Sequence, residues 1–169
     1  LAALYCATAV SVFSYSSKLF LDNLYKFGFI KNVKEKSKKK KTIDKTESVL
    51  LNAKSELSES TKVIAAIFGG LFLALSKTFW FQSTSVEVYS LHLLLITLII
   101  LFLLKAYVKS FENDKLINWL VFAFFLALGF TNHLTTLMIL PGTAYLYFSR
   151  YKFNSASFKK LSLMILLFI

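Results

Sequence analysis

Cysteine, proline, glycine and acidic residues are all scarce in this chain of 169 residues. The single cysteine, Cys6, excludes an internal disulfide framework and a metal site built from cysteine ligands. One proline and five glycines leave no proline-rich or glycine-rich linker. Nine acidic residues face twenty lysines and arginines, so the net charge is +11. In a soluble protein this charge would point to nucleic acid. Here the basic residues lie between apolar blocks, and no nucleic-acid partner is expected.

Long apolar blocks are what the chain has instead. Hydrophobic residues make up 56% of it, against ~45–50% in ordinary soluble domains. A helix needs ~20 mostly apolar residues to cross the hydrocarbon core of a bilayer. We therefore predict an all-α, polytopic transmembrane helix bundle with about five spans and a truncated sixth. The predicted spans cover 1–20, 63–81, 88–104, 116–131, 134–149 and 161–169.

The two ends of the chain both fall inside apolar runs, which indicates a piece of a longer polypeptide. The run from Leu1 to Val12 also has the length of the apolar region of a secretory signal. No charged segment precedes it and no small-residue cleavage site clearly follows it. A truncated span, continued to about residue 30 by its cytoplasmic end, is the preferred interpretation.

The apolar stretch 116–148 has two interpretations. It forms either one helix that ends before Pro141 or two short spans that turn at Asn132 and His133. Lysine and arginine accumulate in cytoplasmic loops. Ten such residues lie in 31–62, three in 105–115 and four in 149–160. Two spans place all seventeen on one side of the membrane, so we predict two.

The basic segment 31–62 is predicted to be a cytoplasmic loop that separates the first span from the bundle at 63–169. Its cluster Lys38-Lys-Lys-Lys41 favours a solvated loop that fixes the orientation of the chain. The alternative is attraction to anionic lipid, worth ~1 kcal/mol for each cation near the surface.

Two polar clusters fall on the predicted outer face, and each contains one of the two histidines. The first runs from Lys77 to His92 and the second from Gly129 to Thr136. Trp80 and its two phenylalanine neighbours are typical of an interfacial aromatic belt. Glu87 has two interpretations. It is a solvated loop acid, or it lies at membrane depth as a functional group, where an unpaired carboxylate would cost a few kcal/mol.

His133 and its neighbours also have two interpretations. Asn132 is a residue type that favours turns and helix caps, and His133 is then a turn residue that bonds the backbone. Thr135 and Thr136 could bond back to the helix backbone. Alternatively His133 contacts a ligand. Two histidines and Glu87 lack close spacing, so no metal site is predicted, and dependence on a divalent metal is left open.

The two clusters carry a family resemblance. The segments Thr78-Phe-Trp-Phe-Gln82 and Glu87-Val-Tyr-Ser-Leu-His92 resemble one signature of bacterial multi-pass membrane proteins related to animal transmembrane protein O-mannosyltransferases. The run Leu128-Gly-Phe-Thr-Asn-His-Leu-Thr-Thr-Leu-Met-Ile-Leu-Pro141 resembles their second signature. The resemblance covers about residues 1–150, except the loop 31–62. The family is similar to a branch of the GT-C glycosyltransferase superfamily.

The resemblance implies a function. Such enzymes move a sugar, here possibly mannose, from a polyprenyl-phosphate carrier to an acceptor hydroxyl on a protein or glycan at the outer membrane face. It also implies a bacterial inner-membrane location and a principal catalytic acid in an outer loop upstream of this fragment. Glu87 and His133 are then supporting catalytic residues. The expected substrate-binding residues are Trp80, Gln82, Tyr89, His92 and Asn132.

A transporter or channel subunit and a non-catalytic membrane scaffold are the alternatives. Intramembrane acids and histidines also mark ion paths, but the interiors of these predicted spans are almost wholly apolar. A scaffold leaves both polar clusters without a role. The enzyme is therefore favoured.

Overall fold

The computed structural model describes residues 1–28, 57–84 and 89–166, and all regular structure in these residues is helical. The predicted all-α class is confirmed. The elements are α1 (Ala2–Asp22), α4 (Glu59–Leu75), α5 (Lys77–Thr84), α6 (Tyr89–Lys109), α7 (Leu116–Asn132), the 3₁₀ helix η1 (Leu134–Ile139), α8 (Leu140–Tyr151) and α9 (Ser155–Leu166).

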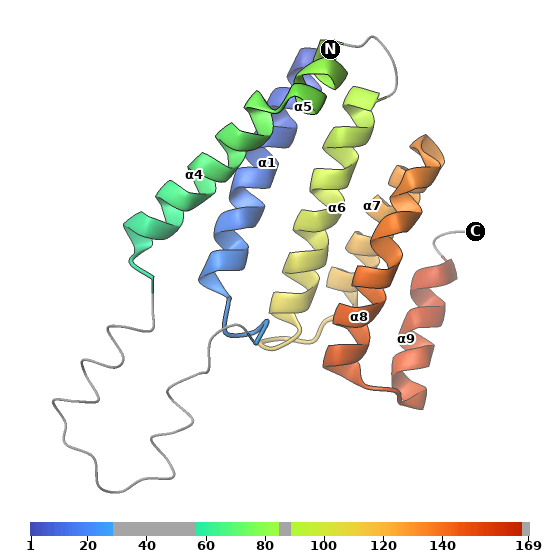
Figure 1. Cartoon of the computed structure of the whole chain (residues 1–169). Helices are drawn as coiled ribbons and strands as arrows, with labels where there is room; N and C mark the ends of the chain where they lie inside the picture. The colour runs from blue at the N-terminus through green and yellow to red at the C-terminus, as the bar shows by residue number, and fades with distance from the viewer. Residues whose placement is uncertain (29–56, 85–88, 167–169) are drawn as a thin grey trace, which may run out of the picture.

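The helices form a bundle in which α1 and α6 lie side by side near the middle (Figure 1). Helix α4 packs on α1, and α7 packs on α6, with α8 and α9 beyond it. Helix α5 lies at one end of the bundle, where it contacts α1, α4 and α6. The first turn of α6, the last turn of α7 and η1 also lie at this end (Figure 1).

Small and hydroxylated residues allow α1 and α4 to approach closely. A Cβ atom at Gly70 of α4 would collide with Oγ of Ser14 and lie 3.3 Å from its Cβ, so a larger residue there would require the Ser14 side chain to move. The Ser14 hydroxyl donates to the carbonyl oxygen of Val10 at 3.0 Å, and Ser16 and Ser17 bond back in the same way. These bonds satisfy the hydroxyl groups within their own helix, which suits a helix in apolar surroundings.

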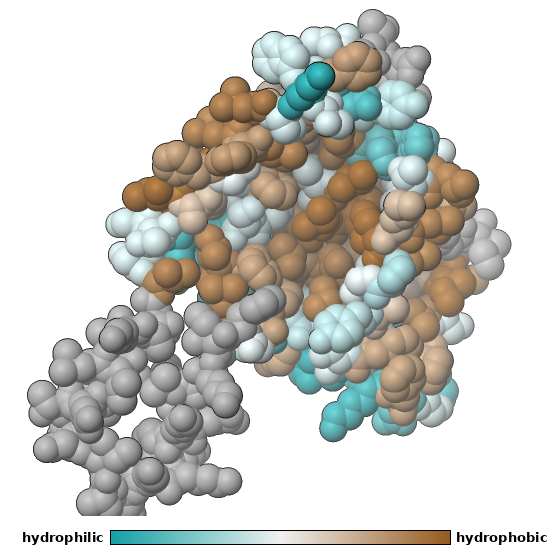
Figure 2. All heavy atoms as spheres, in the orientation of Figure 1, coloured by the Kyte–Doolittle hydropathy of each residue, from teal (hydrophilic) through white to brown (hydrophobic). Residues whose placement is uncertain are grey.

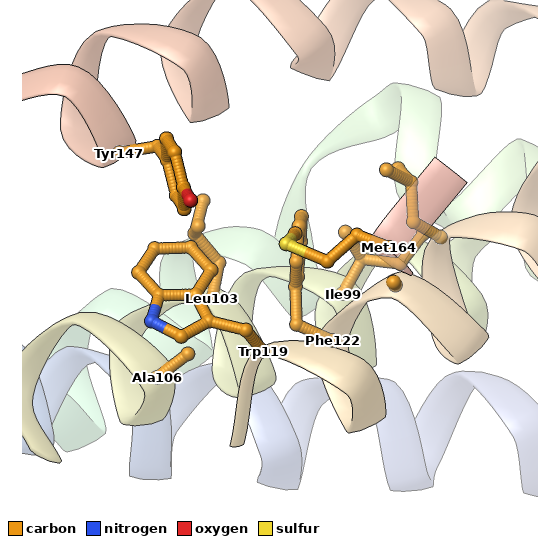
Figure 3. Close-up of a cluster of buried hydrophobic side chains, with 9 residues drawn as sticks. Ile99, Leu103, Ala106, Trp119, Phe122, Tyr147 and Met164 are labelled. Carbon is orange, nitrogen blue, oxygen red and sulfur yellow. The ribbon is translucent and has the colours of Figure 1, made fainter. Parts of the chain in front are cut away.

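The main hydrophobic core joins α6, α7, α8 and α9 (Figure 3). Trp119 and Phe122 of α7 are at most 1% exposed, and Ile99 of α6 is fully buried. The Trp119 ring meets the Tyr147 ring edge-on, with centroids 5.1 Å apart. Aromatic pairs in this geometry add ~0.5–1.5 kcal/mol to the free energy of burial. The core therefore fixes α7 against its neighbours along most of its length.

Ion pairs and hydrogen bonds to charged side chains gather at the opposite end of the bundle. We call this the ionic end. Lys26 pairs with Glu112 at 2.6 Å, and Lys160 of α9 pairs with Asp114 at 2.6 Å. The guanidinium of Arg150 donates to the carbonyl oxygen of Ser110 at 2.9 Å. The connection 110–115 is thereby held to α8 and α9 at one end of the molecule.

One described helix is long and apolar enough, by length and composition, to cross a membrane. This helix is α6, and the pair α4 and α5 also qualifies if its two bent parts are counted as one span. Helix α1 is equally long, but its serines and tyrosines lower its hydropathy. Apolar side chains also cover the outer face of α4, where Phe72 is 81% exposed and Phe68 is 59% exposed (Figure 2). The five predicted spans stay a prediction.

Several helix bounds differ from the predicted spans. The segment 63–81, which the sequence predicts as one span, bends by 61° between α4 and α5, and whether it forms one span stays a prediction. The break lies at Ser76, whose extended backbone ends α4 and whose Oγ accepts a hydrogen bond from the N–H of Phe79 at 3.3 Å. Serine often caps a new helix in this way. Helix α4 begins at Glu59, inside the predicted loop, and α9 begins at Ser155 rather than 161.

Candidate functional site

A sharp change of direction at residue 133 separates α7 from η1. The backbone of His133 is extended (φ −155°, ψ 130°), and its N–H donates to the carbonyl oxygen of Gly129 at 2.9 Å. The His133 side chain caps the next helix, since Nδ1 accepts from the backbone N–H of Thr135 at 3.3 Å. Pro141 then lies in the first turn of α8, where its missing N–H needs no partner.

Gly129 allows α7 to pack against both α6 and η1 at this turn. A Cβ at this position would lie 2.6 Å from Cδ1 of Ile99 and 3.0 Å from Cγ2 of Thr136. Thr136 is fully buried beneath it. The small residue therefore sets the distance between the end of α7 and η1, and with it the position of His133.

The two histidines meet at this end of the bundle. Their ring centroids are 4.8 Å apart, although 41 positions separate them in the sequence. The Thr135 hydroxyl lies between them, 3.0 Å from Nε2 of His92 and 2.9 Å from Nδ1 of His133. The ring of Tyr89, the first residue of α6, lies 5.6 Å from the His133 ring. Tyr89, His92, His133 and Thr135 thus form one cluster, which we call the histidine cluster.

The histidine cluster combines a buried ring with a more accessible one. His92 is 7% exposed, whereas His133 and Tyr89 are half-buried. Burial removes His92 from water, so each of its nitrogens needs a partner inside the protein. Nε2 has Thr135, but Nδ1 is buried and has no hydrogen-bond partner.

Three further polar atoms near this end are buried without a hydrogen-bond partner. They are Oε1 of Gln82, on α5, Nδ2 of Asn132, the last residue of α7, and Oγ1 of Thr136, in η1. A buried polar atom left unpaired costs about 1–3 kcal/mol. Such groups are normally satisfied by protein, by an ordered water or ion, or by a ligand. The unpaired donors and acceptors at this end are groups that a water or a polar ligand would satisfy.

The other predicted site residues have different positions. Glu87 lies outside the described residues. Trp80 is on α5, with 65% of its surface exposed, which agrees with an interfacial aromatic side chain as well as with a binding residue. Thr135 was not among the predicted site residues, because a threonine beside a helix usually bonds its own backbone. The signal that the sequence offers for Thr135 is its place in the second polar cluster, two residues after His133.

A metal centre has no support in the part of the chain that the structure describes. Nowhere in residues 1–28, 57–84 and 89–166 do three histidine, cysteine, aspartate or glutamate side chains gather in a way that could hold an ion.

The fold and the site together define a class: an apolar helical bundle with a neutral polar cluster at one end and charged groups at the other. Comparison with known families narrows this class. Residues 1–157 match the family described as the N-terminal domain of protein O-mannosyl-transferase TMEM260. The chain belongs to this family, which confirms the predicted relation to animal protein O-mannosyltransferases. Neither a curated protein nor a solved structure matches the chain.

The family also relates the chain to glycosyltransferases. An O-mannosyltransferase implies a sugar donor and an acceptor for the sugar. Together with the apolar helix α6, the family indicates association with a membrane.

Proposed function

We propose that the protein transfers a sugar, mannose by its family, from a polyprenyl-phosphate carrier to an acceptor hydroxyl. The observation that carries this proposal is the histidine cluster, in which His92, Thr135 and His133 are joined by hydrogen bonds at the end of an apolar bundle. Such a site offers hydrogen bonds at a depth that a lipid-borne substrate reaches from the side.

The chemistry of the proposed transfer calls for a hydrogen-bond donor beside the carrier phosphate. The acceptor oxygen forms a new bond to the sugar C1 atom while the bond between C1 and the phosphate oxygen breaks. The electrons of the broken bond go to the phosphate, and the proton of the acceptor hydroxyl goes to a carboxylate base, which the family resemblance assigns to an outer loop of the longer protein. A fixed donor that faces the developing charge lowers the barrier, and loss of one such donor costs about 10²–10³ in kcat. Imidazole donates a hydrogen bond while neutral and carries charge near neutral pH. The half-buried His133 is the group that we assign to the phosphate.

The proposed arrangement in the membrane follows from the two ends of the bundle. We infer a multi-pass protein of the GT-C type, with the ionic end and the loop 31–62 in the cytoplasm of a bacterial cell. The histidine cluster then faces the outer side of the inner membrane. The abundance of lysine at one end and its near absence at the other support this orientation.

The remaining site residues receive supporting roles. Glu87 precedes α6 by two residues, and we assign it to orient acceptor or sugar hydroxyls. Gln82 and Asn132 have unpaired polar atoms that suit sugar hydroxyls, and Tyr89 offers an aromatic face beside His133. Trp80 is assigned to the sugar or its carrier at the membrane interface.

A transfer assay tests the proposal. Membranes from cells that express the full-length protein are given polyprenyl-phosphate mannose with a radiolabelled sugar, and labelled protein is measured. We expect transfer above that of membranes without the protein, and a loss of about 10²-fold or more with His133→Ala. Glu87→Gln should also lower transfer. Absence of transfer by the wild type, or wild-type transfer by both variants at equal folded yield, would contradict the proposal.

A further inference from the structure

We infer that Thr135 is a positioning residue, which fixes the hydrogen positions of both imidazoles so that His133 presents an N–H group to a phosphate oxygen. The inference rests on the proposed function for the identity of the ligand, but its geometric part stands by itself. It depends on three contacts: the two that the Thr135 hydroxyl makes and the one that its backbone N–H makes.

The backbone contact determines the hydrogen of His133. A backbone N–H can only donate, so Nδ1 of His133, which faces the N–H of Thr135 at 3.3 Å, must be an acceptor without a hydrogen. A neutral imidazole has one N–H group. The hydrogen of His133 therefore sits on Nε2. No residue in the described parts of the chain accepts a hydrogen bond from that nitrogen, and we assign it to the ligand.

The hydroxyl contact then determines the hydrogen of His92. The Thr135 hydroxyl has one hydrogen, and because Nδ1 of His133 has none we assign the hydroxyl as the donor across the 2.9 Å contact. The single lone pair of Nδ1 is then shared between this hydroxyl and the backbone N–H of Thr135. Its oxygen accepts from Nε2 of His92 at 3.0 Å, which must carry the hydrogen. Nδ1 of His92 is left as a bare acceptor, in keeping with its lack of a partner. In the opposite arrangement the hydroxyl would donate to His92 and accept from Nδ1 of His133. The hydrogen on Nδ1 would then point at the backbone N–H of Thr135, so this arrangement is excluded.

All hydrogen bonds of the cluster thus run toward His133. His92 donates to Thr135, and Thr135 donates to His133. Hydrogen bonds in such a chain polarise one another. Donation into Nδ1 draws electron density from the ring and makes the N–H at Nε2 a stronger donor. The chain also prevents the His133 ring from turning, so this donor keeps its direction.

The ligand chemistry is that of a phosphate oxygen. A phosphate ester accepts hydrogen bonds and has none to give when ionised, and a neutral imidazole with its hydrogen outward is complementary to it. A polyprenyl monophosphate and free inorganic phosphate share this chemistry. A carrier that reaches the site from the lipid should bind where the free ion does not, because only the carrier brings an apolar chain.

The first part of the test measures hydrogen positions directly. The full-length protein, labelled with ¹⁵N-histidine and reconstituted in lipid nanodiscs, is studied by NMR, with His133→Ala as the assignment control. We expect the hydrogen of His133 on Nε2 and that of His92 on Nε2. A hydrogen on Nδ1 of His133 would overturn the inference, whatever the activity of the protein.

The second part compares three threonine variants. Thr135→Val removes the hydroxyl, and we expect kcat for sugar transfer to fall about tenfold, the worth of one hydrogen bond, with KM little changed. Thr135→Ser keeps the hydroxyl and should restore kcat. Thr131→Val is the matched control, because the exposed Thr131 hydroxyl donates to the carbonyl oxygen of Leu128 in its own helix. Equal kcat in the wild type and Thr135→Val, or equal losses in Thr135→Val and Thr131→Val, would refute the positioning role.

The third part identifies the ligand. Addition of a polyprenyl monophosphate should shift the ¹⁵N resonance of His133 Nε2, and inorganic phosphate at the same concentration should not. A shift with neither would refute the phosphate contact, and an equal shift with both would refute the requirement for the lipid chain. If the hydrogen positions are as expected but no sugar is transferred, the proposed function fails while the assignment of hydrogens stands.

Discussion

The two ends of the helix bundle treat their polar groups in opposite ways. At the ionic end, Asp114 receives hydrogen bonds from Tyr151 and from Lys160, and Arg150 is bonded to Ser110. At the other end, His92 and Asn132 each bury a polar atom without a partner. Satisfied charged groups stabilise and orient a fold, whereas unsatisfied buried groups need a water, an ion or a ligand to complete them. We therefore expect mutations at the ionic end to change stability and mutations in the histidine cluster to change activity.

Trp119→Ala should have the largest effect on stability. Trp119 is 1% exposed, and its Nε1 donates to the Tyr151 hydroxyl at 2.9 Å, so it links the core to the ionic end. Truncation of a buried tryptophan costs about 3–5 kcal/mol. Thermal unfolding of the purified protein in detergent should show a large fall in Tm. Phe124→Ala, on the same helix but 52% exposed, is the control, and an equal fall in that variant would show that the core is misplaced.

Gly129→Ala should have the next largest effect, and it tests how the histidine cluster is held. The added Cβ would meet Ile99 and Thr136 at 2.6 and 3.0 Å. Overpacking of this kind costs about 1–3 kcal/mol, and it moves η1 with His133, so both Tm and sugar transfer should fall. Gly142→Ala is the matched control, since no atom lies within 4 Å of its Cβ position. Gly142→Ala should be neutral or stabilise by up to ~1 kcal/mol; a loss there as large as at Gly129 would contradict the packing argument.

Asp114→Asn should cause a smaller loss, of about 1–2 kcal/mol at pH 7, because Asp114 is partly exposed. Burial acts to raise the pKa of the Asp114 carboxyl, but the hydrogen bonds from Lys160 and Tyr151 outweigh it, and the pKa lies below its ordinary value. A carboxyl whose pKa is lowered by folding stabilises the folded state above its unfolded pKa, about 3.9. This stability is lost as the pH falls through the lower, folded pKa.

The pH dependence gives the measurement for Asp114. The difference in unfolding free energy between wild type and Asp114→Asn should be constant from pH 7 to about pH 5 and should shrink below about pH 4. Denaturant unfolding at several pH values measures it. A difference that grows as the pH falls would mean that the carboxylate is not the stabilising form. Sugar transfer for each folded molecule should stay at the wild-type level.

The sequence predicts the type of secondary structure in this fold well, and it predicts the bends and packing of the helices less well. Long apolar blocks predict helices because no other element fits them, and the helical class is confirmed. The bend at Ser76 was missed because Leu75 and Lys77 lie in an apolar run whose hydropathy does not record a backbone break. The Ser76 hydroxyl accepts a hydrogen bond from the N–H of Phe79 at the start of α5. A single bond of this kind leaves no periodic pattern in the sequence.

The candidate site shows the same limit. The sequence marked Tyr89, His92 and His133 by their type and their place in two polar clusters, and the structure brings these three together. The roles of these residues, and all of Glu87, stay predictions. Thr135 was passed over because its importance comes from a residue 43 positions away, which only the packing of η1 on the start of α6 reveals.

The most direct test of the division between the two ends measures sugar transfer and Tm in two variants of the same full-length protein. His133→Ala should lower turnover from polyprenyl-phosphate mannose by about 10²-fold or more, with Tm close to that of the wild type. Asp114→Asn should lower Tm while turnover for each folded molecule is unchanged. If His133→Ala instead lowers only Tm, or if Asp114→Asn lowers turnover as strongly as His133→Ala, the active end of the bundle has been assigned incorrectly.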